Sequence, residues 1–345
     1  MIMKTAGKLL VQLFFLLLIL IIIPGCTNMD RTGLQPSTGG TNELMVVTND
    51  EATWKGKVGQ TISQFFEQEV PGLPQPESMF NIAHIPEDNL SKMLRIHHNV
   101  FIVDINDKYK EPILETKTDF WSSPQRLVKM TVPSEEAFYK EFDKNKEAFL
   151  ELFNANERRR VNLAYGAIED FKITKMLKEK YDINLLIPKS FYVAAQEDNF
   201  VWMRREAERF SQAIMIYTYP YTDTLAFNYD RIIEIRDSIT KKYIPGPSEG
   251  SYMKVSMIEP PIAKTLDFNG HYAVEMRGLW DLYGDFMGGP FLSYTLVDQR
   301  HNRVVTIEGY VYNPSQEKRD LIRQLESLIY TLSFPKDDEE NLAKK

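Results

Sequence analysis

The sequence has very little cysteine, because its 345 residues contain only Cys26. One thiol cannot form a disulfide within the chain, and it cannot supply the several thiolates of a structural zinc site. Positive charge is also in deficit. The 41 Lys and Arg side chains are outnumbered by 48 Asp and Glu, which gives a formal net charge of −7. A protein that binds nucleic acid without sequence preference needs a basic face, so nucleic acid is not an expected partner.

Motifs for phosphate and metal binding are missing as well. The chain has no Gly-x-Gly-x-x-Gly pattern and no phosphate-binding loop with its lysine. The five histidines are scattered, and the adjacent pair His97-His98 would point to opposite faces of a strand. Ser-x-x-Lys spacings occur at Ser238 and Ser251 without the partner motifs that such a nucleophile needs. We therefore expect no cofactor, no metal and no serine or cysteine hydrolase.

A short apolar segment near the N-terminus predicts a cleaved signal peptide. Lys4 and Lys8 precede the run 9–23, which is apolar except for Gln12. A helix of this length is about 22 Å long, which is shorter than the ~30 Å hydrocarbon core of a membrane. The run ends in Ile23-Pro24-Gly25-Cys26, which resembles the bacterial lipobox. An uncleaved membrane helix with an incidental cysteine is the alternative.

Cys26 is the expected lipidation site, and residues 1–25 are the expected signal peptide. Its thiol can be alkylated by a diacylglyceryl group, and cleavage frees an amine for a third acyl chain. Several chains, at about 0.8 kcal/mol per buried CH₂, give a stable anchor in the membrane. Residues 26–42 are rich in Thr, Ser, Gly and Asn and are expected to be a flexible tether. Because Thr27 and not Asp follows the cysteine, we expect the outer membrane, facing the periplasm, with surface exposure as the alternative.

Hydrophobic patterns beyond the tether predict two tandem, related α+β units with antiparallel or mixed sheets and helices packed on them. The first unit is expected at 43–155, the second at 182–334, with a connector helix at 156–181 and a charged tail at 335–345. Strands are expected at 44–48, 80–85, 100–105, 127–132, 183–193, 200–204, 213–217, 253–258, 272–276, 291–297 and 303–312. Pro71-Gly72 and Pro245-Gly246 are each expected to end a helix, one in each half. The recurrence of this helix-ending pair suggests a duplication. Chance recurrence is the alternative.

Three segments carry a resemblance to a known family. Residues 79–86, 96–100 and 278–291, together with the lipobox, resemble an uncharacterised family of predicted Bacteroidota-type lipoproteins, a domain of unknown function. The resemblance covers nearly the whole chain after Cys26 and implies no particular activity. The second half, 182–334, is also faintly similar to the α/β/α sandwich of PsbP-type photosystem accessory proteins. That likeness implies a binding or assembly role, but a fold alone does not fix a function.

The candidate binding residues gather in an aromatic stretch at 278–291. Trp280, Tyr283 and Phe286 stand there among four glycines. Rigid aromatic rings on a loop are typical of surfaces that recognise sugars, peptides or partner proteins. The alternative is that the rings close the end of the sheet as part of its core. Trp121, in a long loop of the first half, is expected to flank a groove shared with this stretch.

Two carboxylates in the same stretch, Asp281 and Asp285, are four residues apart. Paired acids perform glycosidase chemistry at a set separation or hold a hard cation, but the neighbouring glycines disfavour the helix that would align them. We therefore expect a lipid-anchored, non-enzymatic binding or assembly module of the cell envelope, with an envelope protein or a glycan as its partner. The alternatives are an envelope enzyme acting on glycans or peptidoglycan through these acids, and an accessory subunit of a transport or secretion complex.

Overall fold

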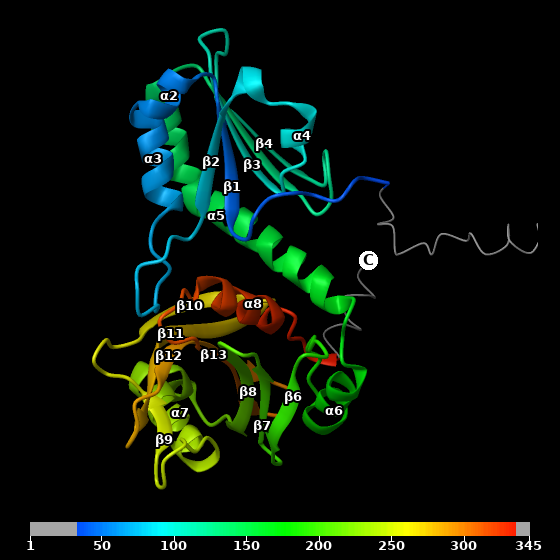
Figure 1. Ribbon diagram of the computed structural model, residues 1–345, viewed down its shortest axis with the longest axis vertical. Helices are drawn as coiled ribbons and strands as arrows, with labels where there is room; N and C mark the ends of the chain where they lie inside the picture. Colours follow the sequence, from blue (N-terminus) through cyan, green and yellow to red (C-terminus); the bar gives the residue numbers. More distant parts are fainter. Residues whose placement is uncertain (1–32, 336–345) are drawn as a thin grey trace, which may run out of the picture. The chain divides into compact units, whose positions relative to one another are not determined.

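The computed structural model describes residues 33–335, which contain two β-sheets (Figure 1). The first sheet has five strands and the second has eight. From Pro36 onward the chain forms one body by its internal contacts. Helices pack on both sheets, so the predicted α+β class is confirmed.

The first sheet is mixed. Its strand order is β2-β1-β3-β5-β4, and only β4, at one edge, runs antiparallel to its neighbour. The strands are β1 (Glu43–Thr48), β2 (Asn81–Pro86), β3 (Asn99–Ile105), β4 (Ile113–Thr118) and β5 (Arg126–Val132). The helices are α2 (Glu51–Lys55), α3 (Lys57–Phe66), η1 (Glu87–Asn89), α4 (Lys92–Arg95) and α5 (Glu135–Gly166). Between α3, α5 and the sheet lies a cluster of phenylalanine rings that includes Phe66, Phe101 and Phe153.

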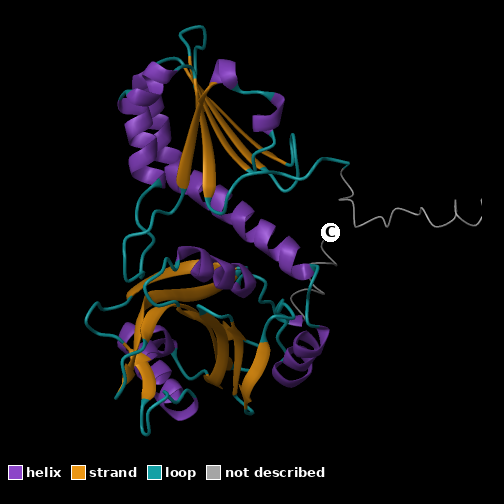
Figure 2. Cartoon of the chain, in the orientation of Figure 1, coloured by secondary structure: helices purple, strands orange, loops and turns teal. Residues whose placement is uncertain are grey.

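The second sheet is antiparallel and curled, and helices pack on both of its faces (Figure 2). Its strand order is β10-β11-β12-β13-β8-β7-β6, and β9 pairs with β11. Its strands are β6 (Tyr192–Gln196), β7 (Phe200–Glu206), β8 (Ser211–Pro220), β9 (Tyr252–Val255), β10 (Ile262–Phe268), β11 (His271–Tyr283), β12 (Gly288–Asp298) and β13 (Arg303–Tyr312). The helices α6 (Phe171–Tyr181) and α8 (Arg319–Ile329) cover one face, whereas η2 (Thr224–Phe227) and α7 (Tyr229–Tyr243) lie on the other.

The strand directions do not support the predicted duplication. The first sheet is largely parallel and the second is antiparallel, so the recurring Pro-Gly pairs lie in different structural contexts. The stretch 156–181, expected as a connector helix, contains the C-terminal part of α5 and then, after a turn, α6. The predicted strand at 183–193 is largely irregular, with β6 beginning only at Tyr192.

Residues 36–42, expected to belong to the tether, pack on the first sheet. Ser37 N donates to Ser123 O at 3.1 Å, and His98 N donates to Thr38 O at 2.9 Å. The His98 ring also contacts Thr38 O through Nδ1 at 2.7 Å. Its Nε2 lies 2.7 Å from Glu157 Oε1 of α5. The remainder of the predicted tether and Cys26 lie outside the described residues.

The buried carboxylate of Glu157 binds several side chains and one backbone N–H around this segment. Besides His98, it accepts hydrogen bonds from Asn42 N at 3.2 Å and Asn99 Nδ2 at 2.7 Å, and it pairs with Arg160. Burial raises the pKa of the Glu157 carboxyl, but the hydrogen bond and charge of His98, the charge of Arg160 and the Asn42 N–H together lower it below its ordinary value. The carboxylate is thus held ionised where β1, β3 and α5 meet.

A second buried ion pair joins α7 to the second sheet. Arg236 Nε donates to Glu308 Oε2 at 2.8 Å, and Nη2 donates to Oε1 at 2.6 Å. Both side chains are at most 1% exposed. The guanidinium also lies 4.3 Å from the centre of the Phe291 ring. Burial raises the pKa of Glu308 above its ordinary value, although Arg236 opposes this shift.

Polar contacts connect the two halves at the start of α8. The Glu77 carboxylate, from the first half, accepts hydrogen bonds from the backbone N–H groups of Lys318 and Arg319 at 2.8 Å each. The Arg319 guanidinium donates a hydrogen bond to Ser78 O at 2.8 Å. Asn42 Nδ2 donates to Asp320 Oδ1 at 2.9 Å. The first half therefore supplies the N-terminal cap of a helix that belongs to the second half.

Acid should weaken the fold through Glu275 of β11. This carboxylate accepts bonds from Arg277 Nε at 2.9 Å and Tyr294 Oη at 2.8 Å. Burial raises the pKa of Glu275, but the charge and hydrogen bond of Arg277, with the Lys264 charge and the Tyr294 hydrogen bond, together lower it to about 2, from 4.5. Because the folded-state pKa is the lower one, the contribution of Glu275 is complete above pH 4.5 and is lost as the pH falls toward 2. Urea unfolding from pH 6 to pH 3 should show a shallower loss of stability for Glu275→Gln than for wild type.

Candidate functional site

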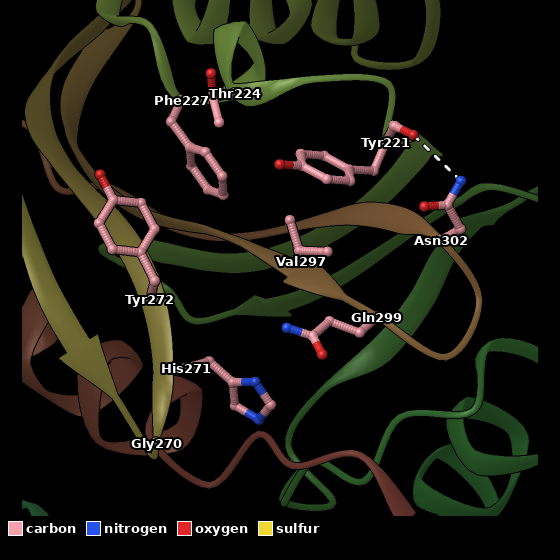
Figure 3. Close-up of a pocket in the computed structure, with 9 residues that line it drawn as sticks. All are labelled: Tyr221, Thr224, Phe227, Gly270, His271, Tyr272, Val297, Gln299 and Asn302. Atoms are coloured by element: carbon pink, nitrogen blue, oxygen red, sulfur yellow. Dashed lines mark hydrogen bonds between the residues drawn. The ribbon is translucent and has the colours of Figure 1, made fainter.

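A pocket of about 560 Å³ opens on the α7 face of the second sheet, next to the start of α7 (Figure 3). We call it the aromatic pocket, because three aromatic rings and a set of neutral polar side chains form its walls. Its lining residues are Tyr221, Thr224, Phe227, Gly270, His271, Tyr272, Val297, Gln299 and Asn302.

Three turns position these side chains. After β8 the chain passes through η2, whose N-cap Asp223 accepts a hydrogen bond from Leu225 N at 2.8 Å. The β10–β11 hairpin closes with Asn269-Gly270, and both residues have positive φ, at 53° and 87°. Asn-Gly is the preferred pair for such a two-residue turn, since both residues tolerate the left-handed region. In the β12–β13 turn, Asn302 Nδ2 donates to Tyr221 O at 3.3 Å and joins the first turn to the third.

The aromatic rings contact one another around an apolar floor. Phe227 meets Tyr272 edge to face at 5.0 Å, and its ring centre lies 6.4 Å from that of Tyr221. Figure 3 shows these three rings around Val297, with His271 and Gln299 beyond it. Tyr272 is 58% exposed, so its ring is accessible from solvent. Ring faces and a valine floor suit a ligand with an apolar surface.

The polar part of the lining consists of amides, hydroxyls and the His271 ring. Two amides, from Gln299 and Asn302, and hydroxyls from Thr224 and the tyrosines offer both donors and acceptors. The His271 ring packs edge to face on Phe334 at 5.3 Å. Among the described residues that line the pocket, none is Asp, Glu, Lys or Arg. The arrangement can therefore bind an uncharged, hydrogen-bonding ligand, and it presents no pair of carboxylates to a substrate.

The structure places the predicted aromatic residues elsewhere. The expectation of a loop at 278–291 is wrong, since β11 and β12 occupy most of it and pair, with Trp280 opposite Gly289. A Cβ at Gly289 would lie 2.0 Å from Val311 O, so this glycine permits close packing of strands and does not confer flexibility. Trp280 is 3% exposed and donates from Nε1 to Val311 O at 3.2 Å. Tyr283 and Phe286 are exposed at the hairpin end.

The predicted carboxylate pair is not aligned on a helix. Asp281 lies on β11 and pairs with Lys254 Nζ at 2.8 Å. Asp285 lies in the following turn, where it accepts a hydrogen bond from Ser248 Oγ at 2.7 Å. The bond from Ser248 lowers the pKa of Asp285 below its ordinary value. Neither residue lines the aromatic pocket, so the geometry gives no support to an enzyme that uses these two acids.

Ser248 belongs to a Gly-x-Ser-x-Gly spacing, 246–250, which sequence reasoning overlooked. In a serine hydrolase this motif forms a sharp turn from a strand into a helix, with a histidine beside the serine. Here it lies in the loop that follows α7 and precedes β9, and the hydroxyl of Ser248 bonds to Asp285. The spacing is therefore not a nucleophile elbow.

Trp121 lies on the first sheet. It packs with Ile85, Leu90 and Leu94, and the Arg95 guanidinium lies 5.6 Å from the centre of its ring. Trp280 belongs to a different hydrophobic cluster, under α7 on the second sheet. The groove that the two tryptophans were expected to share is not formed by these clusters.

Sequence reasoning missed the aromatic pocket because its residues come from three separated turns. The β12–β13 turn at 298–302 was expected, but the β10–β11 turn was not. The signal that was available is Asn269-Gly270, a strong hairpin pair that directly precedes His271 and Tyr272. Nothing in a single sequence places Tyr221 and Phe227 beside that hairpin.

Two further properties hold for residues 33–335. Within this range no three His, Cys, Asp or Glu side chains converge in a way that could hold a metal ion. The helices of the same range are all too short or too polar to cross a bilayer.

Comparison with known proteins identifies two domains of unknown function. Residues 37–165 match the family model of DUF8532, and residues 170–331 match that of DUF4837. Both are described as domains of unknown function, which agrees with the expected resemblance to an uncharacterised family. No curated protein matches the sequence.

Several solved structures are distantly similar to part of the chain. The Ran-binding protein Mog1p of Saccharomyces cerevisiae is 10% identical, with 44% of this chain and 90% of Mog1p covered and a TM-score of 0.29. LpqN of Mycobacterium tuberculosis, titled as involved in cell envelope biogenesis, is 11% identical over 44% and 82%, with a TM-score of 0.26. Human STARD10 is 9% identical over 51% and 85%, with a TM-score of 0.21. At these TM-scores the likenesses do not establish a common fold.

Proposed function

We propose that the protein is a lipid-anchored binding module of a bacterial cell envelope, and that its aromatic pocket binds a neutral glycan. One observation carries the choice of ligand: the pocket combines three aromatic rings with amide and hydroxyl groups, and none of its described lining residues is Asp, Glu, Lys or Arg. A sugar ring presents apolar C–H faces and a rim of hydroxyls, which match these two kinds of surface. A phosphorylated or carboxylated ligand would require Arg or Lys in the lining.

The size of the pocket supports a binding role. Its volume of about 560 Å³ falls within the roughly 300–1,000 Å³ that is typical of small-ligand sites. Asp223 and Asp267 accept hydrogen bonds from Leu225 N and Gly270 N, and Asn302 donates one to Tyr221 O. These bonds hold the turns that build the pocket, which supports a site whose walls are formed before a ligand arrives. A preformed site loses less conformational entropy on binding.

Glycan binding is tested by calorimetric or NMR titration of the protein with uncharged oligosaccharides, including chitobiose-type and hexose disaccharides. Tyr272→Ala and Gln299→Ala should each weaken binding at least tenfold, which is about 1.4 kcal/mol. Tyr283→Ala is the matched control, because Tyr283 is 57% exposed, like Tyr272 at 58%, but lies on another hairpin. Binding that survives both pocket substitutions, or that requires a charged sugar, contradicts the proposal.

The anchor rests on Cys26 and the apolar run before it, and it is tested separately. In a bacterium that processes lipoproteins, the wild-type protein should incorporate labelled palmitate, and its mature N-terminus should carry acyl mass. Cys26→Ser should lose the label and retain residues 1–25, because the modification that precedes cleavage needs the thiol. Thr27→Ser, the neighbouring conservative change, should behave as wild type. A mature wild-type protein without acyl mass contradicts the anchor.

A further inference from the structure

A second cleft lies on the same face of the second sheet, lined by the chain just after α7. We call it the tryptophan cleft; its volume is about 260 Å³. Trp202 of β7, Trp280 of β11 and Tyr310 of β13 form its walls, and Pro245 and Pro247 line it from the loop that follows α7. It shares no lining residue with the aromatic pocket.

The indole groups present carbon surface to the cleft because their polar atoms are already bonded within the protein. Trp202 Nε1 donates to Tyr310 Oη at 2.9 Å, and Trp280 Nε1 donates to Val311 O at 3.2 Å. The rings of Trp280 and Tyr310 meet edge to face at 5.5 Å. The part of a ligand that lies against these indole groups must be apolar, since a polar group there would lose its hydration without a partner. The hydroxyl-bearing side chains Ser211 and Tyr312 also line the cleft.

Arg204 is the one charged residue among the described residues that line the cleft. Its guanidinium lies 4.8 Å from the centre of the Trp202 ring, and it pairs with Glu206. Its side chain is 33% exposed, and that of Glu206 is 44% exposed, so this is a weak surface pair. A guanidinium has five N–H donors, so it can donate to a second carboxylate in addition to that of Glu206.

The cleft therefore joins an apolar cavity to a cation at its edge. We propose that it binds an anionic amphiphile with one acyl chain, the chain lying against Trp202 and Trp280 and the carboxylate meeting Arg204. The volume is below the roughly 300–1,000 Å³ of sites for drug-sized ligands, which favours one chain over a lipid with several.

The end of the β11–β12 hairpin extends this apolar surface. Met287 lines the cleft, and the preceding residue, Phe286, is fully exposed. An acyl chain that protrudes from the cleft would meet this ring.

Tryptophan fluorescence reads the cleft directly, because two of the four tryptophans line it. In a Trp54→Phe/Trp121→Phe protein, whose fold is checked by circular dichroism, the remaining signal comes from Trp202 and Trp280. Titration with decanoate below its micelle concentration should give a saturable change. Arg204→Gln should weaken decanoate binding at least tenfold and leave the binding of decanol, the uncharged analogue, unchanged.

Arg205→Gln is the matched control on the same strand, since the Arg205 side chain bonds to Tyr165 and Gln212 and does not line the cleft. It should bind decanoate as the parent protein does. The proposal is overturned by a signal that does not saturate, or by equal decanoate affinity in Arg204→Gln. It is also overturned if N-acetylphenylalaninamide binds more tightly than decanoate, since the occupant would then be a protein side chain. Tyr272→Ala should not affect decanoate, so a failure here is distinct from a failure of the glycan proposal.

Discussion

Arg236→Met is expected to lower the free energy of unfolding by about 3–5 kcal/mol, because it leaves the Glu308 carboxylate buried without its cation. Glu308 is 0% exposed and receives two hydrogen bonds from Arg236. Burial already raises the pKa of Glu308 in the wild type, and loss of Arg236 should raise it further. A carboxyl with a raised folded-state pKa gains stability as the pH falls, so the deficit of the variant should be smaller at pH 5 than at pH 8.

Two variants separate this electrostatic cost from a loss of packing. Arg236→Met/Glu308→Met should recover most of the lost stability, because no charge then remains unpaired. Arg231→Met, on the same helix, removes an exposed pair with Glu234 and should leave stability close to that of wild type. Chemical denaturation of all four proteins at pH 5 and pH 8 provides the comparison. A double variant as unstable as Arg236→Met would show that the arginine acts through packing.

Glu157→Ala should lower the free energy of unfolding by a similarly large amount, about 3–5 kcal/mol. The substitution leaves several buried hydrogen-bond donors without an acceptor. His98, Asn42 and Asn99 all bond to this carboxylate, and His98 is 0% exposed. The loss should also be local. Amide hydrogen exchange at Asn42 and at Ser37, whose segment the His98 ring contacts through Thr38 O, should accelerate more than exchange in the second sheet.

Glu147→Ala is the control for that substitution, because Glu147 is exposed on the same helix. It should alter stability by about 0.5 kcal/mol or less and leave exchange at Asn42 unchanged. If Glu157→Ala lowers stability uniformly, with no added exchange at residues 37–42, the carboxylate does not hold this segment.

Several elements were predictable because their patterns are local. The strands of the first sheet other than β4 follow apolar runs, and the helix α5 begins after Ser134, a good N-cap whose side chain accepts from Ala137 N. The strand β4 was missed because nearly all its side chains are exposed, so its sequence lacks the alternation that marks a half-buried strand. The direction of pairing was also beyond reach, since similar runs form parallel strands in one sheet and antiparallel strands in the other.

The candidate site was less predictable than the fold. Trp280 was chosen for its glycine-rich surroundings, yet Gly289, opposite it, permits close strand packing, and the ring is a wall of the tryptophan cleft. Tyr221, Tyr272 and Gln299 lie in or next to three turns that only the completed sheet brings together. Tyr and Gln are common on protein surfaces, so these residues do not indicate a site in the sequence. They indicate a site only when the fold brings them together.

The first half caps α8 of the second half through Glu77, and this has a consequence for how the two halves can evolve or be separated. Glu77 satisfies amides at the start of the last helix, so a fragment that begins at residue 170 would leave Lys318 N and Arg319 N to water. Such a fragment should fray at α8 and expose the apolar side chains, Ile322 and Leu325 among them, that this helix buries against the second sheet. Separating the two domains at their boundary would therefore give a second domain that is less soluble. This is a physical reason for the two domains to stay joined in one chain.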